Sequence, residues 1–310
     1  MPSTPRRLAR ADGALALGVM DGDRLRAFVI VVAAYAAALV GAIATSALLG
    51  QDAPIRTVFV ADCVATLVVF AASMAFANSS LYDPYWSVAP PVIGLYWASL
   101  PAIPAVQSRQ WLVLALVFAW GIRLTANWAR GWPGLHHQDW RYDMLRERAS
   151  APYWLVSLTG IHYFPTLIVF VGCLPLYAAL AAGARPLGFV DGLACAVTAG
   201  AIALEGIADE QLRAFNRAKQ AGEICTRGLW GWSRHPNYLG EIGFWWGLWL
   251  FGLAAEPAWW WSAIGPLAIT VMFLAASIPM LEERSHARRP GWAEHAARVP
   301  ALLPRRPRSP

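Results

Sequence analysis

The chain has 310 residues, of which 57% are hydrophobic and only 14% are charged, whereas soluble domains are about a quarter charged. Its 25 Lys and Arg and 19 Asp and Glu give a formal net charge of +6. This composition excludes a soluble enzyme, a disordered chain, a collagen-like fibre and a disulfide-stapled secreted module. It predicts a multi-span membrane protein, and the 17 Trp residues fit this class because indole rings favour the membrane–water boundary.

A membrane-spanning helix needs about 20 mostly apolar residues. Apolar runs with few charges recur along the chain, so we expect an all-α transmembrane bundle of seven to eight spans. The expected spans are 27–49, 57–77, 89–106, 110–128, 154–182, 189–208, 238–255 and 257–281. The third is the least regular, because it contains Pro90, Pro91, Pro101 and Pro104, and proline can interrupt a helix.

The positions of the basic residues predict the orientation. If the N-terminus is cytoplasmic, the inner segments hold 21 of the 25 Lys and Arg, and the outer loops hold only Arg56, Arg109 and Arg185. Basic residues collect on the cytoplasmic side of membrane proteins. We therefore expect a cytoplasmic tail at 1–26, a transmembrane domain at 27–281 and a basic cytoplasmic tail at 282–310. The Arg- and Ala-rich composition favours a bacterial inner membrane.

Polar side chains recur at helical spacing inside several spans, where a charge is costly and usually functional. Most of these polar faces end at the cytoplasmic boundary, so they predict one cavity that opens inward. Hydrogen bonding between helices is the alternative explanation. The polar faces comprise Asp62, Thr66 and Ser73; Arg123, Asn127 and Arg130; Glu205, Asp209, Arg213 and Asn216; and Asn237 with Glu241.

The segment 233–241 reads SRHPNYLGE. Pro236 suits the first turn of a helix, and a helix N-terminus offers free amides and a partial positive charge. Arg234 and His235 directly precede that turn, so the segment predicts a site for the phosphates of a cofactor or for lipid headgroups. The sequence contains no Rossmann fingerprint and no metal-ligand spacing of its histidines. We expect neither a metal site nor nucleic-acid binding.

Three stretches resemble a known family. Arg234–Glu241 resembles the C-terminal signature of the steroid 5α-reductase and sterol-reductase superfamily. Asn78–Ser87 (NSSLYDPYWS) and His137–Tyr142 (HQDWRY) are similar to its bacterial branch, the DUF1295 family. The likeness covers roughly residues 55–305, and the three stretches occur in the same order.

This resemblance implies a helical membrane enzyme that uses NADPH to reduce a carbon–carbon double bond conjugated to a carbonyl. The substrate would be lipid-like, either steroid-like or isoprenoid, and would enter from the bilayer. The cofactor would lie in a cavity that opens to the cytoplasm. The resemblance assigns cofactor binding to Glu205, Asp209, Arg213, Arg234, His235, Asn237, Tyr238 and Glu241.

Reduction of an enone also requires a donor that stabilises the oxygen as it becomes an enolate. In steroid reductases a Glu and a Tyr have these roles, but the first Glu of this chain is Glu147, so no early span supplies that Glu. For Asp83, capping of a turn before Pro84 is an equal alternative to catalysis. The candidate catalytic residues are either Asp62 with Tyr96, or Tyr82, Asp83 and Tyr85.

Two other functions stay open. The Arg-His-Pro-x-Tyr start of the signature and the Glu282–Glu283 pair also occur in isoprenylcysteine-type membrane methyltransferases, which would hold S-adenosylmethionine at a similar cavity. A non-enzymatic lipid-binding protein on the same scaffold is the third hypothesis. Membrane lipids are expected partners in all three cases.

Overall fold

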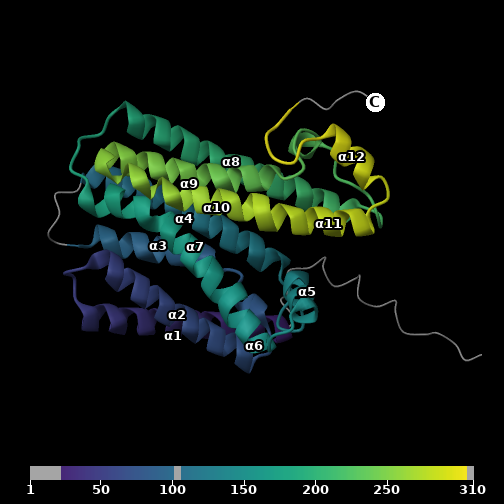
Figure 1. Ribbon diagram of the computed structural model, residues 1–310, viewed down its shortest axis with the longest axis horizontal. Helices are drawn as coiled ribbons and strands as arrows, with labels where there is room; N and C mark the ends of the chain where they lie inside the picture. The colour runs from purple at the N-terminus through teal and green to yellow at the C-terminus, as the bar shows by residue number, and fades with distance from the viewer. Residues whose placement is uncertain (1–21, 101–105, 306–310) are drawn as a thin grey trace, which may run out of the picture.

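The computed structural model describes residues 22–100 and 106–305, and every regular element within them is a helix (Figure 1). Parts of both expected tails, 1–21 and 306–310, and residues 101–105 of the expected third span lie outside the described residues. The longer α-helices are α1 (Gly22–Leu49), α2 (Pro54–Ala75), α3 (Tyr85–Ala98), α4 (Gln107–Gly131), α7 (Phe164–Tyr177), α8 (Phe189–Ala218), α9 (Pro236–Ala255), α10 (Ile264–Met272) and α11 (Ile278–Arg288). The shorter helices are α5 (Trp140–Arg148), α6 (Tyr153–Val156), α12 (Trp292–Arg298) and the 3-10 turns η2 (Ser79–Tyr82), η5 (Gly228–Gly231) and η6 (Pro257–Ala263).

Six continuous helical segments are long and apolar enough to cross a membrane, which indicates a multi-pass membrane protein. They are Gly22–Leu49, Pro54–Ala75, Gln107–Gly131, Tyr153–Ala182, Phe189–Ala218 and Pro257–Arg288. Two segments expected as spans are not among them. The 14 residues of α3 are about 21 Å long, less than the roughly 30 Å of a bilayer core. The 20 residues of α9 contain Asn237 and Glu241 in the first two turns, which shorten the uninterrupted apolar part of this helix.

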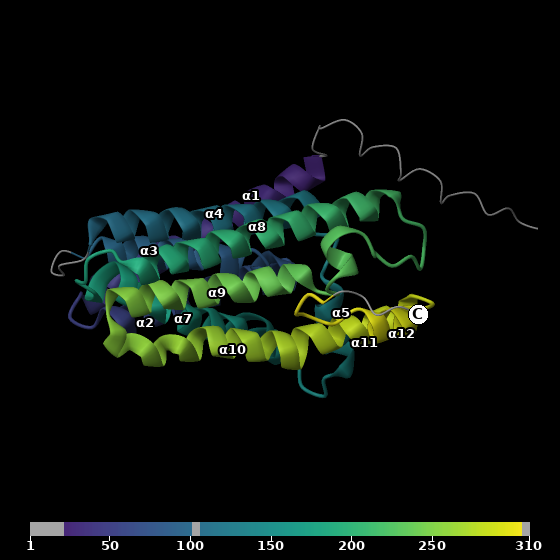
Figure 2. The same ribbon diagram turned by 90° about the horizontal axis from the view of Figure 1, so that it is seen from above.

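The prolines of the third span were expected to interrupt the helix, but two of them do not. Pro90 and Pro91 both lie inside this helix and do not end it. The helix instead ends at Ala98, before Pro101. Near other prolines the helical ladder widens into π-turns, at η3 (Ser157–Tyr163), η4 (Ala178–Ala182) and η7 (Phe273–Ser277), because proline donates no backbone hydrogen bond. The long helices on either side of these turns stay continuous (Figure 2).

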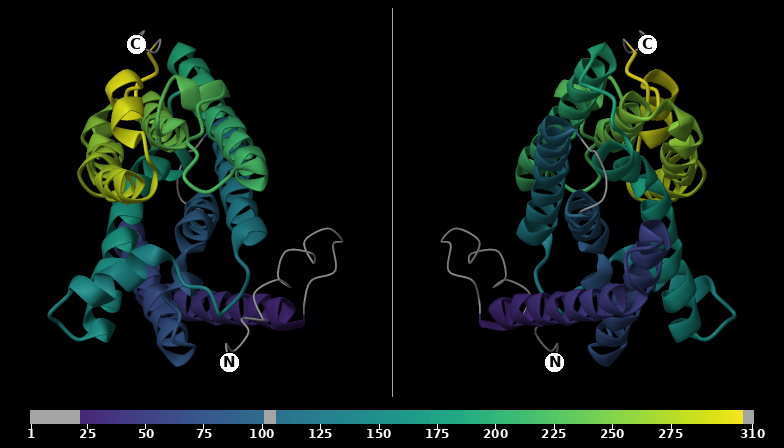
Figure 3. Two further views of the ribbon diagram at one scale, coloured as in Figure 1. Left: turned by 90° about the vertical axis from the view of Figure 1, so that its right-hand side faces the viewer. Right: turned by 90° about the vertical axis from the view of Figure 1, so that its left-hand side faces the viewer.

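The bundle has α1 and α2 along one side, α8 to α11 along the opposite side, and α3, α4 and α7 between them (Figures 1 and 3). The short helices α5 and α12 both lie at one end of the bundle, α12 on the side of α8 to α11 and α5 near α6. The start of α1 lies at that end too, because Arg24 Nε donates to the carbonyl of Trp132 at 3.1 Å, just beyond α4. Both ends of the described chain therefore lie at the same end of the bundle.

Small residues allow α8 and α9 to pack closely. A Cβ atom at Gly247 would lie only 2.1 Å from Thr198 Oγ1, and one at Gly240 would lie 2.7 Å from Glu205 Cβ. Helices in membranes approach each other through such residues, because association there depends on van der Waals packing. The close contact places the first turns of α9 directly against the polar face of α8.

A buried ion pair connects α4 to α8 at the end of the bundle opposite α5 and α12. Arg109 in the first turn of α4 is fully buried, and its Nε lies 2.7 Å from Asp191 Oδ1 in α8. The same guanidinium donates to the carbonyls of Arg185 and Pro186 at 2.8 and 3.2 Å. These bonds satisfy a charge that would otherwise be costly to bury.

Candidate functional site

An apolar pocket of about 390 Å³ lies between α1, α2 and α3, and we call it the α1–α3 pocket. Most of its lining is Ala, Val, Leu and Ile, and three of the predicted catalytic residues, Asp62, Tyr85 and Tyr96, also line it. Tyr85 donates its hydroxyl to Asp62 Oδ1 at 2.6 Å. The hydroxyl of Tyr96 is buried and has no hydrogen-bond partner among the described residues. The structure therefore brings these three residues to one apolar cavity.

Tyr82 and Asp83 do not line the α1–α3 pocket. The Tyr82 ring stacks on Tyr85 with centroids 5.1 Å apart, and its hydroxyl is 2.7 Å from Thr166 Oγ1 on α7. Thr166 Oγ1 in turn lies 2.9 Å from Thr66 Oγ1. Tyr82 thus connects the Asp62–Tyr85 pair to a chain of buried hydroxyls behind the pocket.

Asp83 lies where two stretches that resemble the family, Asn78–Ser87 and His137–Tyr142, contact each other. Tyr142 donates to Asp83 Oδ1 at 2.5 Å, and the backbone N–H of Asp139 donates to Ser80 Oγ at 2.9 Å. Burial raises the pKa of Asp83 to about 6, although Arg141 and the Tyr142 bond act in the opposite direction. The carboxyl of Asp83 thus holds the first turn of α5 against the turn before α3.

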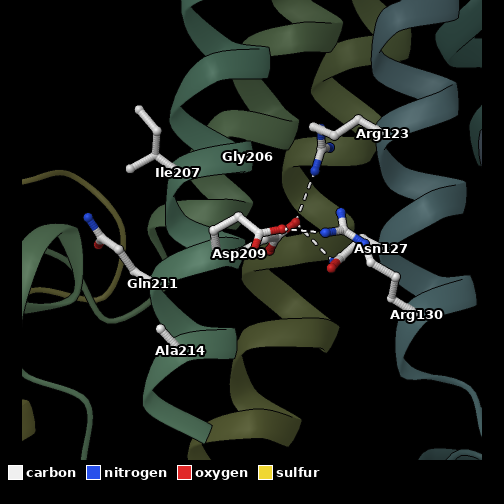
Figure 4. Close-up of a pocket in the computed structure, with 9 residues that line it drawn as sticks. Arg123, Asn127, Arg130, Gly206, Ile207, Asp209, Gln211 and Ala214 are labelled. Carbon is white, nitrogen blue, oxygen red and sulfur yellow. Dashed lines mark hydrogen bonds and ion pairs between the residues drawn. The ribbon is translucent and has the colours of Figure 1, made fainter. Parts of the chain in front are cut away.

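A network of charged groups joins α4 and α8 (Figure 4). Arg123 lies 2.5 Å from Glu205 Oε2 and 2.9 Å from Asp209 Oδ2. Asn127 donates to Asp209 Oδ2 at 3.0 Å and accepts from Arg213. The predicted i, i+4, i+8 face of α8 therefore points at the polar face of α4. These ion pairs and hydrogen bonds explain how Glu205, Asp209 and Arg213 are tolerated in the long, largely apolar helix α8.

A cavity of about 590 Å³ opens beside this network and is lined by residues of α4 and α8, including Arg123, Asn127 and Asp209. The Nε atom of Arg123 is buried without a hydrogen-bond partner among the described residues. The two faces therefore bring carboxylate acceptors and the Arg123 guanidinium to one cavity.

Glu241 lies deeper, at the contact of α9 with α4 and α8. Trp120 donates its indole N–H to Glu241 Oε2, and Trp245 donates to Oε1, each at 2.9 Å. Because Gly240 packs against Glu205, the Glu241 carboxyl extends the α4–α8 network. We call this set the carboxylate network: Trp120, Arg123, Asn127, Glu205, Asp209, Arg213, Glu241 and Trp245.

The DUF1295 family model, described as a protein of unknown function, matches residues 69–299. The chain belongs to the DUF1295 family. It is also similar to the uncharacterized protein C594.04c of Schizosaccharomyces pombe, at 27% identity over 264 residues, which cover 77% of this chain and 76% of the yeast protein. No solved structure matches the chain.

The Arg-His-Pro segment of this DUF1295 protein forms a clasp with its C-terminal part. Arg234 Nε and His235 Nε2 lie 2.8 and 2.7 Å from Glu282 Oε1, and Trp292 donates to the other oxygen at 2.9 Å. Arg234 also donates to the carbonyls of Ala296 and Val299. The guanidinium predicted to hold a phosphate therefore binds protein groups and fixes the chain around α12.

The remaining residues of the signature do not join the clasp. Tyr238 stacks on His235, with rings 16° from parallel, and packs against Phe273. Asn237 lines a small cavity beside the clasp, which Arg234 and His235 also line. The structure thus divides the predicted cofactor residues of this DUF1295 protein among the carboxylate network, the clasp and this cavity.

Sequence reasoning missed several partners at these sites. Trp245 lies one turn after Glu241, so its spacing was a usable signal, whereas nothing in the sequence connected Trp120 to Glu241. Glu282 was noted only as part of an acidic pair, and its contact with Arg234 crosses 48 residues of sequence.

Proposed function

We propose that this protein is an NADPH-dependent membrane oxidoreductase of the steroid 5α-reductase-like type. It reduces a carbon–carbon double bond conjugated to a carbonyl in a lipid-like substrate. The observation that carries the proposal is the Asp62–Tyr85 hydrogen bond of 2.6 Å inside the apolar α1–α3 pocket, with the unpartnered Tyr96 hydroxyl in the same lining.

The α1–α3 pocket has the properties that this substrate class requires. Its apolar walls favour a hydrocarbon skeleton, since each buried CH₂ contributes about 0.8 kcal/mol. A substrate carbonyl at the Tyr96 or Tyr85 hydroxyl accepts a hydrogen bond that strengthens as negative charge develops on its oxygen. Asp62 holds the Tyr85 hydroxyl in place and, when protonated, is a proton donor.

The carboxylate network fits a pyridine nucleotide. Carboxylates such as Glu205 and Asp209 have about four acceptor positions each, so pairing with Arg123 leaves acceptors for a carboxamide or a ribose hydroxyl. The free Nε of Arg123 supplies a charged donor. When bound there, NADPH supplies the hydride for the reaction.

The proposed topology has seven to eight crossings, with α3 and α9 completing the bundle inside the ring of lipid-facing helices. Both ends of the described chain lie at the end that carries α5 and α12, and the described parts of the expected inner segments 129–153, 209–237 and 282–310 lie at that end too. We therefore assign this end to the cytoplasm of a bacterial inner membrane. A C-terminal reporter that is active only in the periplasm would contradict this orientation.

The test is a thermal-unfolding titration of the detergent-purified chain with NADPH and with S-adenosylmethionine. NADPH at 100 times its dissociation constant is expected to stabilise the protein by about 2.7 kcal/mol. NADPH oxidation, followed at 340 nm with a steroid enone and an isoprenoid enone as probes, then identifies turnover. Stabilisation by S-adenosylmethionine alone would replace the reductase proposal with the methyltransferase one, and stabilisation by neither would favour a non-enzymatic lipid-binding protein.

One observation favours the methyltransferase as the second candidate. The two elements it shares with isoprenylcysteine-type enzymes, the Arg234-His235 pair and Glu282, are in direct contact at 2.8 and 2.7 Å. The α1–α3 pocket distinguishes the candidates, since methyl transfer needs no acid such as Asp62 next to the substrate.

A further inference from the structure

A small cavity of about 150 Å³ lies between α8, α9, α11 and α12, at the end of the bundle where the clasp is found. We call it the C-terminal cavity. Pockets for whole drug-sized ligands have about 300–1,000 Å³. The C-terminal cavity is therefore sized for a small ion or for one end of a larger ligand. Its polar lining residues are Arg234, His235, Asn237, Ser285, Arg289 and His295.

The C-terminal cavity is positively charged. Arg234 and Arg289 line it, and no Asp or Glu is among its described lining residues. The nearby Glu282 already receives Arg234, His235 and the indole N–H of Trp292. No ion pair or hydrogen bond of the Arg289 side chain occurs within 22–100 and 106–305, and its guanidinium lies 5.3 Å from the Trp292 ring centre. Arg289 is therefore a partly buried cation without a direct ion pair among the described residues, and the Glu282 charge acts on it only from a distance.

Three further polar groups of the lining, Asn237, Ser285 and His295, have no side-chain hydrogen bond among the described residues. His295 is only 7% exposed, and its ring makes no hydrogen bond in the described part of the chain. Burial, followed by the charge of Arg234, lowers the pKa of His295, so the ring is neutral near pH 7 and has one N–H to donate. Asn237, in the first turn of α9, and Ser285 add an amide and a hydroxyl. An oxyanion would satisfy all of these groups together.

We propose that the C-terminal cavity binds a phosphate monoester dianion through Arg289, supported by Asn237, Ser285 and His295. The charge, the size and the free donors favour this anion over a neutral ligand. The free amides at the N-terminus of α9 add to the attraction.

The source of the phosphate follows from the position of the cavity. Asn237 lies one helical turn from Glu241, so a ligand anchored at Asn237 reaches the carboxylate network along α9. NADPH carries one phosphate monoester, the 2′-phosphate, and NADH lacks it. This step rests on the proposed function: the phosphate in the C-terminal cavity is the 2′-phosphate of NADPH. Contact with Arg289 then makes the protein prefer NADPH to NADH. Free inorganic phosphate is the other source.

The experiment compares Arg289→Gln with Arg288→Gln in the full detergent-purified chain. Arg288 is the adjacent residue, is exposed and does not line the cavity, so its variant removes the same charge without touching the site. Dissociation constants for NADPH, NADH and inorganic phosphate are measured from thermal shifts. We expect Arg289→Gln to weaken NADPH at least tenfold, leave NADH unchanged and abolish the NADPH preference. Arg288→Gln is expected to match the wild type within twofold, and Arg289→Lys to recover part of the NADPH affinity.

The outcomes separate this inference from the proposed function. If inorganic phosphate binds the wild type but not Arg289→Gln, and neither nucleotide binds, the anion site stands with free phosphate as its source and the reductase proposal fails. If NADPH binds Arg289→Gln as tightly as the wild type, the anion site is overturned and the reductase proposal stands. Unaltered NADH binding by Arg289→Gln shows that the variant is folded. Absence of binding by all three ligands to the wild type overturns both.

Discussion

The closest helix contact makes a quantitative prediction for Gly247→Ala. The added Cβ would lie 2.1 Å from Thr198 Oγ1 and 3.0 and 3.1 Å from the backbone N and Cα of Thr198. Rotation of the Thr198 side chain relieves only the first of these contacts, so α9 must move away from α8. Overpacking of this kind costs about 1–3 kcal/mol. A rigid backbone clash belongs at the upper end of that range, and the better helix propensity of Ala returns about 1 kcal/mol.

The expected net loss for Gly247→Ala is therefore about 2 kcal/mol. Gly200→Ala in α8 is the matched control, because its Cβ would meet nothing within 4 Å. We expect this control to be neutral or slightly stabilised. Denaturation of the detergent-solubilised protein, followed by the fluorescence of its 17 Trp residues, measures both. A Gly247→Ala variant as stable as Gly200→Ala would refute the close packing of α8 on α9 and the position of Glu241 that depends on it.

Three further predictions concern charged groups. The pKa of Asp83 is about 6 in the folded chain, above its ordinary 3.8, so ionisation of this carboxyl lowers the free energy of unfolding as the pH rises from about 4 to 6. Over that range we expect the wild type to lose up to about 3 kcal/mol of stability relative to Asp83→Asn in thermal-unfolding scans. A difference between the two proteins that does not change with pH would contradict this. Asp191→Asn leaves Arg109 buried without its counter-charge, so we expect a loss of about 3–5 kcal/mol in the same denaturation assay, which an unchanged midpoint would disprove. Asp62→Asn and Tyr85→Phe are expected to lower turnover while NADPH still binds; activity equal to the wild type would assign the pair a structural role.

Hydropathy predicted the positions of the helices well but not their ends. The apolar run ended at 208, whereas α8 continues to Ala218, as the helical spacing from Glu205 to Asn216 predicted. The extra turns are stabilised by Arg123 and Asn127 of another helix, and no one-dimensional window contains that contact. The prediction that prolines interrupt the third span was wrong for Pro90 and Pro91, because the bundle accommodates both inside α3.

The site was predictable where the relevant residues share one helix. The spacing of Glu205, Asp209 and Arg213 predicted a common polar face, and these residues do form one network. Contacts between distant segments were not accessible in this way. Asp83 and Tyr142 are 59 residues apart, and only the folded chain shows that two recognisable stretches are halves of one junction.

The family match begins at residue 69, whereas α1 and Asp62 lie before it. The α1 and α2 walls of the α1–α3 pocket thus lie before the match, whereas its α3 wall, with Tyr85 and Tyr96, lies within the match together with the helices of the carboxylate network. Residues 22–68 can therefore be exchanged without altering any residue of the carboxylate network. Chimaeras that exchange residues 22–68 between members are expected to change which lipid is transformed while nucleotide affinity stays with the host.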